Sequence, residues 1–256
     1  MPDPRLARYW DVLARDSALE SILTGKAAST WNADEFFGTG RAHVARIMRE
    51  VACRVPHLGH AAALDFGCGV GRVTVPFAAH FEKVVGVDAA PAMIARARQM
   101  HATEPRCRFV LNRRGHLRKF RSGSFDLVHS ALVLQHIPPA FARRYISELI
   151  RVTAPGGVTV FQLPEPIEPD AEEIFCNAPV VGPPLKRAIP RWIVRRWRGF
   201  KYRRIADRAP RMAMFGLVRV DVVHTIAKAG GQLLDALDDR SHGTDVPGFL
   251  YIVERT

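Results

Sequence analysis

Residues 63–88 read ALDFGCGVGRVTVPFAAHFEKVVGVD, and this stretch decides the fold. Its opening, residues 63–66, is apolar apart from one aspartate, which is typical of a buried strand. Glycines follow at every second position, Gly67, Gly69 and Gly71, and they permit the positive φ angles of a tight turn. A ligand can lie against bare backbone where such a turn opens a helix. The stretch therefore predicts a strand, a ligand-binding turn and a helix.

The spacing of these glycines argues against a dinucleotide site. The dinucleotide fingerprint G-x-G-x-x-G would place its third glycine at position 72, where this chain has Arg72. Asp65 stands two residues before the first glycine, where its charge would repel a pyrophosphate. The same charge would attract the ammonium and sulfonium groups of S-adenosylmethionine, so the sign of the charge favours that ligand.

A second carboxylate ends the next predicted strand. Asp88 lies 23 residues after Asp65, the length of one β-α-β unit, so we expect both carboxylates at the same edge of a parallel sheet. Carboxylate oxygens accept hydrogen bonds from the 2′ and 3′ hydroxyls of a ribose. Taken singly, each aspartate could instead cap a helix or a turn. Together, with the glycines between them, they favour a cofactor site.

Alternation of short apolar runs with helical patterns predicts a doubly wound, Rossmann-like α/β fold with a seven-stranded, mainly parallel sheet. The expected strands are residues 61–66, 84–88, 106–111, 125–130, 158–163, 232–237 and 249–254. Residues 91–101 and 139–152 are expected to be helices, because each begins with a proline near the first helical position. Another amphipathic helix contains Val220, Val223, Ile226 and Ala227, and Gly230 with Gly231 ends it.

Two segments are expected to cover the sheet, which would consist of residues 41–163 and 217–256. Residues 1–40 form a predicted N-terminal helical cover, and residues 164–216 a predicted cap inserted between the fifth strand and the last helix. The apolar residues of the first cover are Leu6, Tyr9, Trp10, Leu13 and Leu19, followed by the aromatic cluster Trp31, Phe36 and Phe37.

The net charge of +12 is concentrated in the predicted cap. Nine lysines and arginines lie between residues 186 and 204 with no acid, which leaves +3 for the remainder. Apolar residues at helical spacing predict an amphipathic basic helix over 185–204. It could close the active site with its apolar face, lie on an anionic membrane surface, or bind nucleic acid. No RNA-binding motif accompanies the charge, so nucleic acid is the less favoured of these partners.

The remaining composition is that of an ordinary globular protein, with 48% hydrophobic and 24% charged residues. No apolar run approaches the length of a spanning helix and no secretory signal opens the chain, so we expect a cytoplasmic protein, with peripheral membrane contact as one interpretation. The cysteines at 53, 68, 107 and 176 form no C-x-x-C pair, which argues against a disulfide framework or a zinc site, and no metal is expected.

Together these motifs resemble motifs I and II of class I S-adenosylmethionine-dependent methyltransferases. Residues 124–137 and 151–157 are similar to the fourth and fifth strand motifs of that family. The resemblance covers about residues 36–163 and the closing helix and strand pair. It implies S-adenosylmethionine as cofactor and S-adenosylhomocysteine as product. The site residues that it implies or adjoins are Asp65, Gly67, Cys68, Gly69, Gly71 and Arg72 at the methionine part, Asp88 and Ala89 at the ribose, His116 and Leu117 at the adenine, and Ser130 and Gln135 after the fourth strand.

One position departs from the pattern of the family. Many relatives carry an acid where His116 stands, and that acid accepts a hydrogen bond from the adenine amino group. Backbone contacts around Gly115 and Leu117 could substitute for it. Pro76 is a second irregularity, because a proline inside the helix after the glycine turn removes a backbone hydrogen bond unless it falls in the first turn.

Methyl transfer from a sulfonium is an in-line displacement, so an enzyme contributes mostly by orienting the acceptor in a dry site. His136, beside Gln135 after the fourth strand, is the candidate proton acceptor for a hydroxyl substrate. The alternative is that His136 only packs or caps the next helix. His129, inside the strand, is predicted to be a core residue.

The acceptor is expected to be a small molecule, a lipid or a glycan, methylated on oxygen rather than on nitrogen or carbon. Residues 130–133 read SALV, where enzymes that methylate the amino groups of bases carry N-P-P-Y or D-P-P-Y. Two alternatives stay open: an RNA methyltransferase, and a non-catalytic scaffold that binds membrane or RNA through the basic helix. The sequence carries no signal for the oligomeric state.

Overall fold

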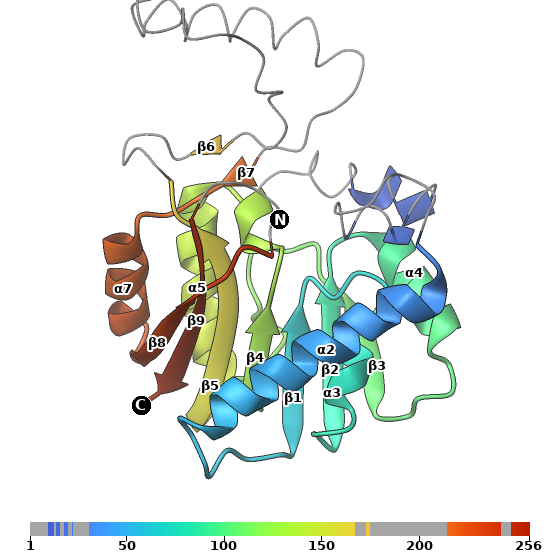
Figure 1. The fold of residues 1–256 in the computed structure, drawn as a ribbon, viewed down its shortest axis with the longest axis horizontal. Helices are drawn as coiled ribbons and strands as arrows, with labels where there is room; N and C mark the ends of the chain where they lie inside the picture. The colour runs from blue at the N-terminus through green and yellow to red at the C-terminus, as the bar shows by residue number, and fades with distance from the viewer. Residues whose placement is uncertain are drawn as a thin grey trace, which may run out of the picture.

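The computed structural model describes residues 10–12, 14–15, 18–19, 22, 31–166, 173–174, 214–241 and 247–256. Most of them form one seven-stranded sheet with helices on both faces (Figure 1). The basic segment 185–204 lies outside the described residues, so its predicted helix and its membrane contact stay predictions. No helix in the described ranges combines the length and the apolar character that a membrane span requires.

The sheet has the strand order β3-β2-β1-β4-β5-β9-β8, and its inner strands are parallel. Only β9 runs against its neighbours β5 and β8, which confirms the predicted mainly parallel Rossmann-like sheet. The strands are β1 (Ala62–Phe66), β2 (Lys83–Asp88), β3 (Cys107–Leu111), β4 (Phe125–Ser130), β5 (Thr153–Pro164), β8 (Gly231–Asp238) and β9 (Gly248–Arg255). The chain order reverses between β1 and β4, and ligands of doubly wound sheets bind at such a switch point.

Helices bury an apolar layer on each face of the sheet. One layer joins α2 (Ala33–Ala52) and α3 (Thr74–Phe77) to apolar side chains of β4, β5 and β9. The other joins α5 (Pro139–Val152) and α7 (Arg219–Lys228) to the opposite face of the same strands. The remaining helix, α4 (Pro91–Met100), packs against β2 and β3. The predicted helices at 91–101 and 139–152 are therefore confirmed, and α4 ends one residue earlier than predicted.

Helix α2 crosses the front of the sheet in Figure 1, and no helix was expected over residues 41–52. Asn32 caps it by accepting a hydrogen bond from the amide of Glu35, 2.9 Å away. Its buried residues recur every three or four positions: Phe36, Gly40, Val44, Ile47 and Val51. The predicted boundary of the N-terminal cover at residue 40 lies inside this helix.

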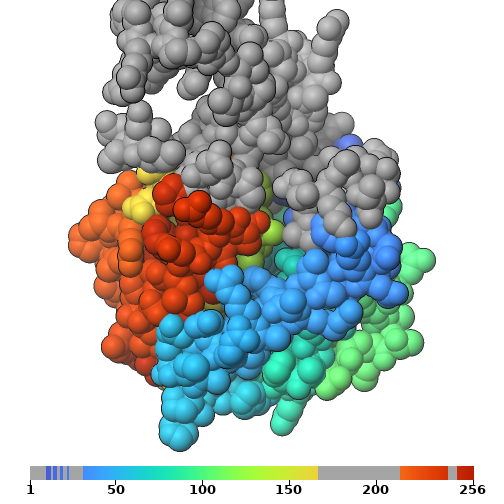
Figure 2. Space-filling view, in the orientation of Figure 1, coloured from blue at the N-terminus to red at the C-terminus, as the bar shows by residue number. Residues whose placement is uncertain are grey.

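Ion pairs fasten α2 to the C-terminal strands. Arg46 of α2 binds Asp239, the residue after β8, at 2.9 Å, and Arg54, two residues beyond α2, binds Asp235 of β8. Figure 2 shows the two segments in contact on one face of the molecule, α2 in blue and the C-terminal residues in orange and red. Residues nearly two hundred positions apart in the chain thereby form one surface.

A second, two-stranded sheet was not predicted. It pairs β6 (Glu173–Ile174) with β7 (Met214–Phe215), so the two ends of the predicted insert meet beside the carboxyl end of β5. The amide of Leu217 also donates to the carbonyl of Pro164, the last residue of β5, at 3.2 Å. Chain that leaves β5 therefore returns to the same edge of the main sheet.

Pro76 is accommodated because α3 is a single turn and Pro76 is its third residue, where amides lack helical partners. Proline cannot donate to the carbonyl of Arg72 four residues earlier, and α2 lies directly against that carbonyl. A Cβ atom on Gly40 would lie 1.9 Å from the Arg72 oxygen. Only glycine at position 40 allows this approach of the helix to the glycine turn.

We expect Gly40→Ala to lower the free energy of unfolding by about 1–3 kcal/mol, because the added methyl group meets backbone that cannot rotate away. Gly38, in the same helix, is the matched control, since a Cβ there meets only the end of the Arg41 side chain at 3.5 Å. Gly38→Ala should raise the free energy of unfolding by up to about 1 kcal/mol through helix propensity. Urea unfolding of both variants measures the difference, and equal effects would contradict this account of Gly40.

Candidate cofactor-binding site

The glycine turn lies at the carboxyl ends of β1 and β2. Gly67, Gly69 and Gly71 have φ angles of 80°, 52° and 90°, in the region that favours glycine. The amides of Gly67 and Cys68 both donate to the carbonyl of Val87, at 2.7 and 3.1 Å. The turn is thus held against the end of β2. Cys68 itself is buried, and burial raises the pKa of its thiol well above the ordinary range.

Asp88 organises this turn from the end of β2. Its carboxylate accepts hydrogen bonds from the amides of Gly69 and Ala90, each at 2.9 Å. Burial raises the pKa of Asp88, and bonds from the amides of Ala90, Gly69 and Ala89 partly oppose that rise. Asp88 therefore has the turn-capping role that was the alternative for it. Each carboxylate oxygen has a second lone pair, so the predicted ribose contact is compatible with these bonds.

Asp65 lies at the end of β1, with a side chain that is 4% exposed. One carboxylate oxygen accepts a hydrogen bond from the Thr74 hydroxyl at 2.6 Å. The other lies 3.0 Å from Nδ1 of His129, which the β1–β4 register places opposite Asp65. His129 is buried, as predicted for a core residue, but it serves a polar contact there. Asp65 and Asp88 do end neighbouring strands, as the spacing predicts.

A second histidine extends this network onto α2. Nε2 of His43 lies 3.0 Å from Nε2 of His129. Burial lowers the pKa of His43 to about 2, and electrostatic interactions with His129, Arg72 and Arg46 contribute to that fall. His43 is therefore neutral at physiological pH.

A cavity of about 290 Å³ opens between α2, the glycine turn and the segment after β4. Arg72 is 7% exposed and lines it, with one guanidinium nitrogen 3.3 Å from the Thr39 hydroxyl. Its Nε has no hydrogen-bond partner in the described part of the chain. Leu132, on the opposite wall, has a φ of 61°, a strained value for leucine. The other lining residues are Thr39, Ala42, His43, Arg46, Ala131 and Ser241.

The segment after β4 brings further polar atoms to this edge of the sheet. Ser130 Oγ and Gln135 Oε1 are buried and lack partners among the residues described. His136 lies in a short 3-10 turn with Nε2 3.2 Å from Nε2 of Gln135, and its ring meets Trp10 edge-on. The structure thus places His136 at the predicted end of the fourth strand, and its role as proton acceptor stays a prediction.

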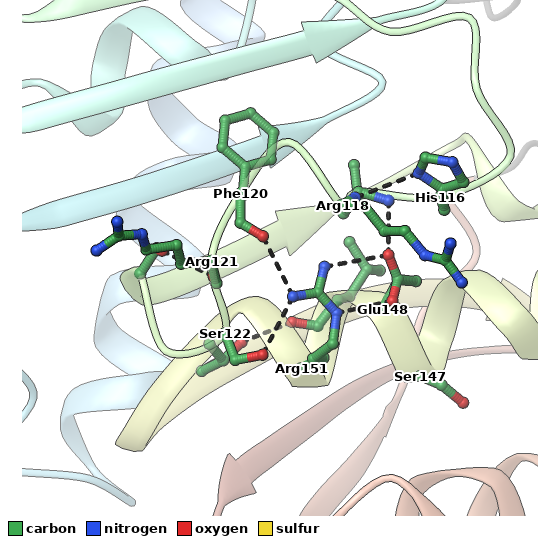
Figure 3. Close-up of polar contacts among 12 residues, drawn as sticks. His116, Arg118, Phe120, Arg121, Ser122, Ser147, Glu148 and Arg151 are labelled. Carbon is green, nitrogen blue, oxygen red and sulfur yellow. Dashed lines mark hydrogen bonds and ion pairs between the residues drawn. The ribbon is translucent and has the colours of Figure 1, made fainter.

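The loop after β3, which carries the predicted adenine contacts, is bound to α5 (Figure 3). Glu148 accepts from the amide of Leu117 at 2.6 Å and from Arg151 at 2.7 Å. His116 accepts from the amide of Arg118 through Nδ1, at 3.3 Å. A neutral His116 then carries its proton on Nε2, so this ring presents a donor where relatives present an acid. The Leu117 amide, the expected substitute contact, is already engaged by Glu148.

The described residues of the N-terminal segment lie over the glycine turn. A Cβ on Gly69 would approach Cδ1 of Ile22 to 2.8 Å. Asp11 accepts a hydrogen bond from the amide of Ala92, in the first turn of α4, at 2.8 Å. These contacts place Asp11 and Ile22 at the edge of the sheet that carries the glycine turn, and the N-terminal helical cover stays a prediction.

The residues that the sequence analysis missed come mainly from α2. Thr39, His43 and Arg46 are four and three positions apart, so they share one face of that helix. The apolar spacing from Phe36 to Val51 was the signal that could have revealed this face. Thr74, just after the glycines, was also missed. Among the described residues no group of histidines, cysteines and acids has the arrangement of a metal site.

Comparison with known proteins places this geometry in a family. A model of the methyltransferase domain matches residues 63–157, from β1 to the start of β5. The chain carries a class I S-adenosylmethionine-dependent methyltransferase domain. This confirms the resemblance drawn from the glycine turn and the two carboxylates.

Relatives of this methyltransferase domain include trans-aconitate 2-methyltransferase of Deinococcus radiodurans, 34% identical over 139 residues, 53% of this chain and 50% of that protein. A 2-methyl-6-phytyl-1,4-hydroquinone methyltransferase of Synechocystis is 32% identical over 38% of this chain and 30% of its own length. The chain spans about half the length of the trans-aconitate relatives it matches, or less for others.

A solved structure with the same fold is magnesium protoporphyrin IX methyltransferase of Synechocystis with bound S-adenosylhomocysteine. It has a TM-score of 0.62 at 15% identity, over 98% of this chain and 99% of that one. At this identity the likeness concerns the fold alone.

The neutral state of His43 has a consequence for the stability of the methyltransferase domain. Below pH 6.5 the unfolded chain protonates this histidine and the folded chain does not, so the free energy of unfolding falls as the pH is lowered. One such group contributes a slope of at most about 1.4 kcal/mol per pH unit. Urea unfolding between pH 4.5 and 8 should show a smaller acid loss for His43→Gln than for the wild type. His60→Gln, at an exposed histidine, is the control, and parallel profiles would refute a buried neutral His43.

Proposed function

We propose that this protein transfers a methyl group from S-adenosylmethionine to an oxygen of a small-molecule or amphipathic acceptor and releases S-adenosylhomocysteine. The observation that carries the proposal is the pairing of charges around the glycine turn. Asp65 and Asp88 lie at the ends of neighbouring strands beside the turn, and Arg72, directly after it, has a buried nitrogen without a partner among the described residues. An amino-acid end, with its ammonium and carboxylate groups, complements this arrangement.

The residues present fit S-adenosylmethionine better than a dinucleotide. The turn offers bare backbone, because the glycines have φ angles that side chains rarely adopt. Two carboxylates at the same edge would repel a pyrophosphate. The orphaned Nε of Arg72 requires an acceptor, and a carboxylate is the strongest that a small ligand supplies. We therefore assign the amino-acid end of the cofactor to the cavity beside Arg72 and His43.

When bound, the cofactor would supply a methyl group on a positively charged sulfur. The protein itself binds and orients the cofactor and excludes water from the site. Asp88 holds the glycine turn in shape through the Gly69 amide, and Asp65 supplies negative charge at the end of β1. His136, oriented by Gln135 and the edge of Trp10, accepts the proton of a hydroxyl acceptor in this proposal.

The acceptor class is supported by the relatives. Their names include trans-aconitate and a phytylated hydroquinone, which are a small and an amphipathic molecule. Each of these names belongs to another protein, and the acceptor of this chain is determined by the residues that lie over β4 and β5. RNA as acceptor and a non-catalytic scaffold are the outcomes that the binding experiment below separates from this proposal.

Calorimetry should show that the protein binds S-adenosylmethionine and S-adenosylhomocysteine but not NAD. Arg72→Gln should weaken both by about tenfold or more, because a charge-assisted hydrogen bond to the amino-acid carboxylate is lost. 5′-Methylthioadenosine, which lacks the amino-acid end, should bind both forms equally. Arg143→Gln, at a surface pair with Asp221, is the control. Absence of binding by the wild type would fit the scaffold alternative, and an equal loss for methylthioadenosine would refute the assignment of the cavity.

His136→Ala should lower turnover by about 10²–10⁴ with a hydroxyl acceptor, because the proton acceptor is removed, and should leave the affinity for S-adenosylmethionine unchanged. Release of S-adenosylhomocysteine across a panel of hydroxyl compounds measures turnover. Unchanged turnover with the preferred acceptor would remove His136 from the mechanism. Loss of cofactor binding instead would show that the residue is structural.

A further inference from the structure

A buried chain of hydrogen bonds joins α2 to the end of β1 through β4. It runs from His43 to His129 at 3.0 Å, from His129 to Asp65 at 3.0 Å, and ends with the Thr74 hydroxyl at 2.6 Å from Asp65. The side chains of His129 and Asp65 are 1% and 4% exposed. The sheet is complete without these contacts, because the hydrogen bonds that pair its strands join backbone atoms. Three of the four groups titrate, and the proposed transfer chemistry uses only Asp65 directly.

The bonding pattern determines where each proton lies. An ionised Asp65 is an acceptor only, so Nδ1 of His129 must carry the hydrogen between them. A neutral His129 then has a bare Nε2, and Nε2 of His43 must donate to it. Replacing either ring by an apolar side chain breaks this order, because the neighbouring ring loses the contact that selects its tautomer.

Burial and nearby cations keep His43 neutral. The charged groups around His43 are Arg72 from the glycine turn and Arg46 from α2, and Arg46 is already paired with Asp239. Among the described residues, Asp65 is the one acid that is hydrogen-bonded to this chain of side chains. A further proton on the histidine pair would cancel that negative charge beside the place proposed for the cofactor's ammonium and sulfonium groups.

We propose that His129 and His43 are positioning residues that hold the Asp65 carboxylate correctly oriented for S-adenosylmethionine. The inference rests on the proposed function, because it assigns Asp65 to the cofactor. His129 acts on Asp65 by donating one hydrogen bond. His43 acts one step further away, by selecting the tautomer of His129 that makes this donation. Thr74 holds the second carboxylate oxygen, so Asp65 is bound at both oxygens and cannot rotate.

Two pairs of variants test this chain. His129→Asn keeps an N–H donor near the position of Nδ1, and His129→Leu removes it; His43→Gln keeps the donor toward His129, and His43→Leu removes it. Calorimetry measures the dissociation constants of S-adenosylmethionine and S-adenosylhomocysteine from pH 5.5 to 8.5, with thermal unfolding recorded for every variant. His60→Leu, at an exposed histidine, is the control and should match the wild type.

His129→Leu should raise the dissociation constant of S-adenosylmethionine by about tenfold or more, and His129→Asn should restore most of the affinity. A carboxylate deprived of a donor takes up a proton more readily, so His129→Leu should also lose affinity toward pH 5.5 where the wild type does not. S-Adenosylhomocysteine, which lacks the sulfonium charge, should lose less. His43→Leu should show the same pattern in weaker form, and His43→Gln should restore most of the affinity that His43→Leu loses.

The outcomes separate this inference from the function on which it rests. A wild type that binds no S-adenosylmethionine refutes the proposed function. A wild type that binds it while folded leucine variants retain its affinity and its pH profile refutes the positioning roles alone. Equal losses in leucine variants and in their polar counterparts would also refute them, because the donor would then be irrelevant. If His129→Leu does not fold, the His43 pair decides the question by the same criteria.

Discussion

The burial of one negative charge at the end of β1 is the constraint on which this structure depends. An isolated carboxylate is expensive to remove from water, so Asp65 has to be compensated by hydrogen bonds and positive charge. Thr74 and His129 supply the bonds, and they come from the turn after β1 and from the neighbouring strand. The parallel β1–β4 pairing, which places His129 opposite Asp65, is therefore as important to the site as the glycines.

Helix α2 extends that compensation across the front of the sheet. It contributes His43 to the buried chain and Thr39 to Arg72, and its glycine at position 40 lies against the Arg72 carbonyl. Ion pairs with the C-terminal strands hold the helix from the other side. The glycine turn, helix α2 and the C-terminal hairpin are thus in direct contact, although they are distant in the chain. The close approach of α2 to the glycine turn and the buried chain of hydrogen bonds occur at the same place, because both require short distances between neighbouring backbones.

The carboxyl edge of the sheet has two halves, and they carry different kinds of residues. The half built on β1, β2 and β3 carries the features shared with class I methyltransferases, where the ligand is the same and the turn geometry is demanding. The half over β4 and β5 presents Ser130, Gln135 and His136 beneath the ends of the insert, and this is where acceptors differ within a fold. The loop after β3 lies between the two: Glu148 and Arg151 bind its backbone to α5, and Nδ1 of His116 accepts from the amide of Arg118 within the loop.

The sequence by itself determined the strand series, the glycine turn and the two strand-end carboxylates. These features are local: a strand, a positive φ angle and a proline at a helix start depend on a few adjacent residues, and the strand spacing follows from one β-α-β unit. The helix over residues 41–52 was not predicted, because the glycines at 38 and 40 lower the helix propensity of this segment. Packing of α2 against the sheet compensates for that loss. Only the tertiary structure decided that His43 meets His129 across 86 positions, that Arg72 faces a cavity, and that Glu148 occupies the Leu117 amide. Such contacts depend on the register of β1 with β4 and on how helices cross the sheet, which no local spacing encodes.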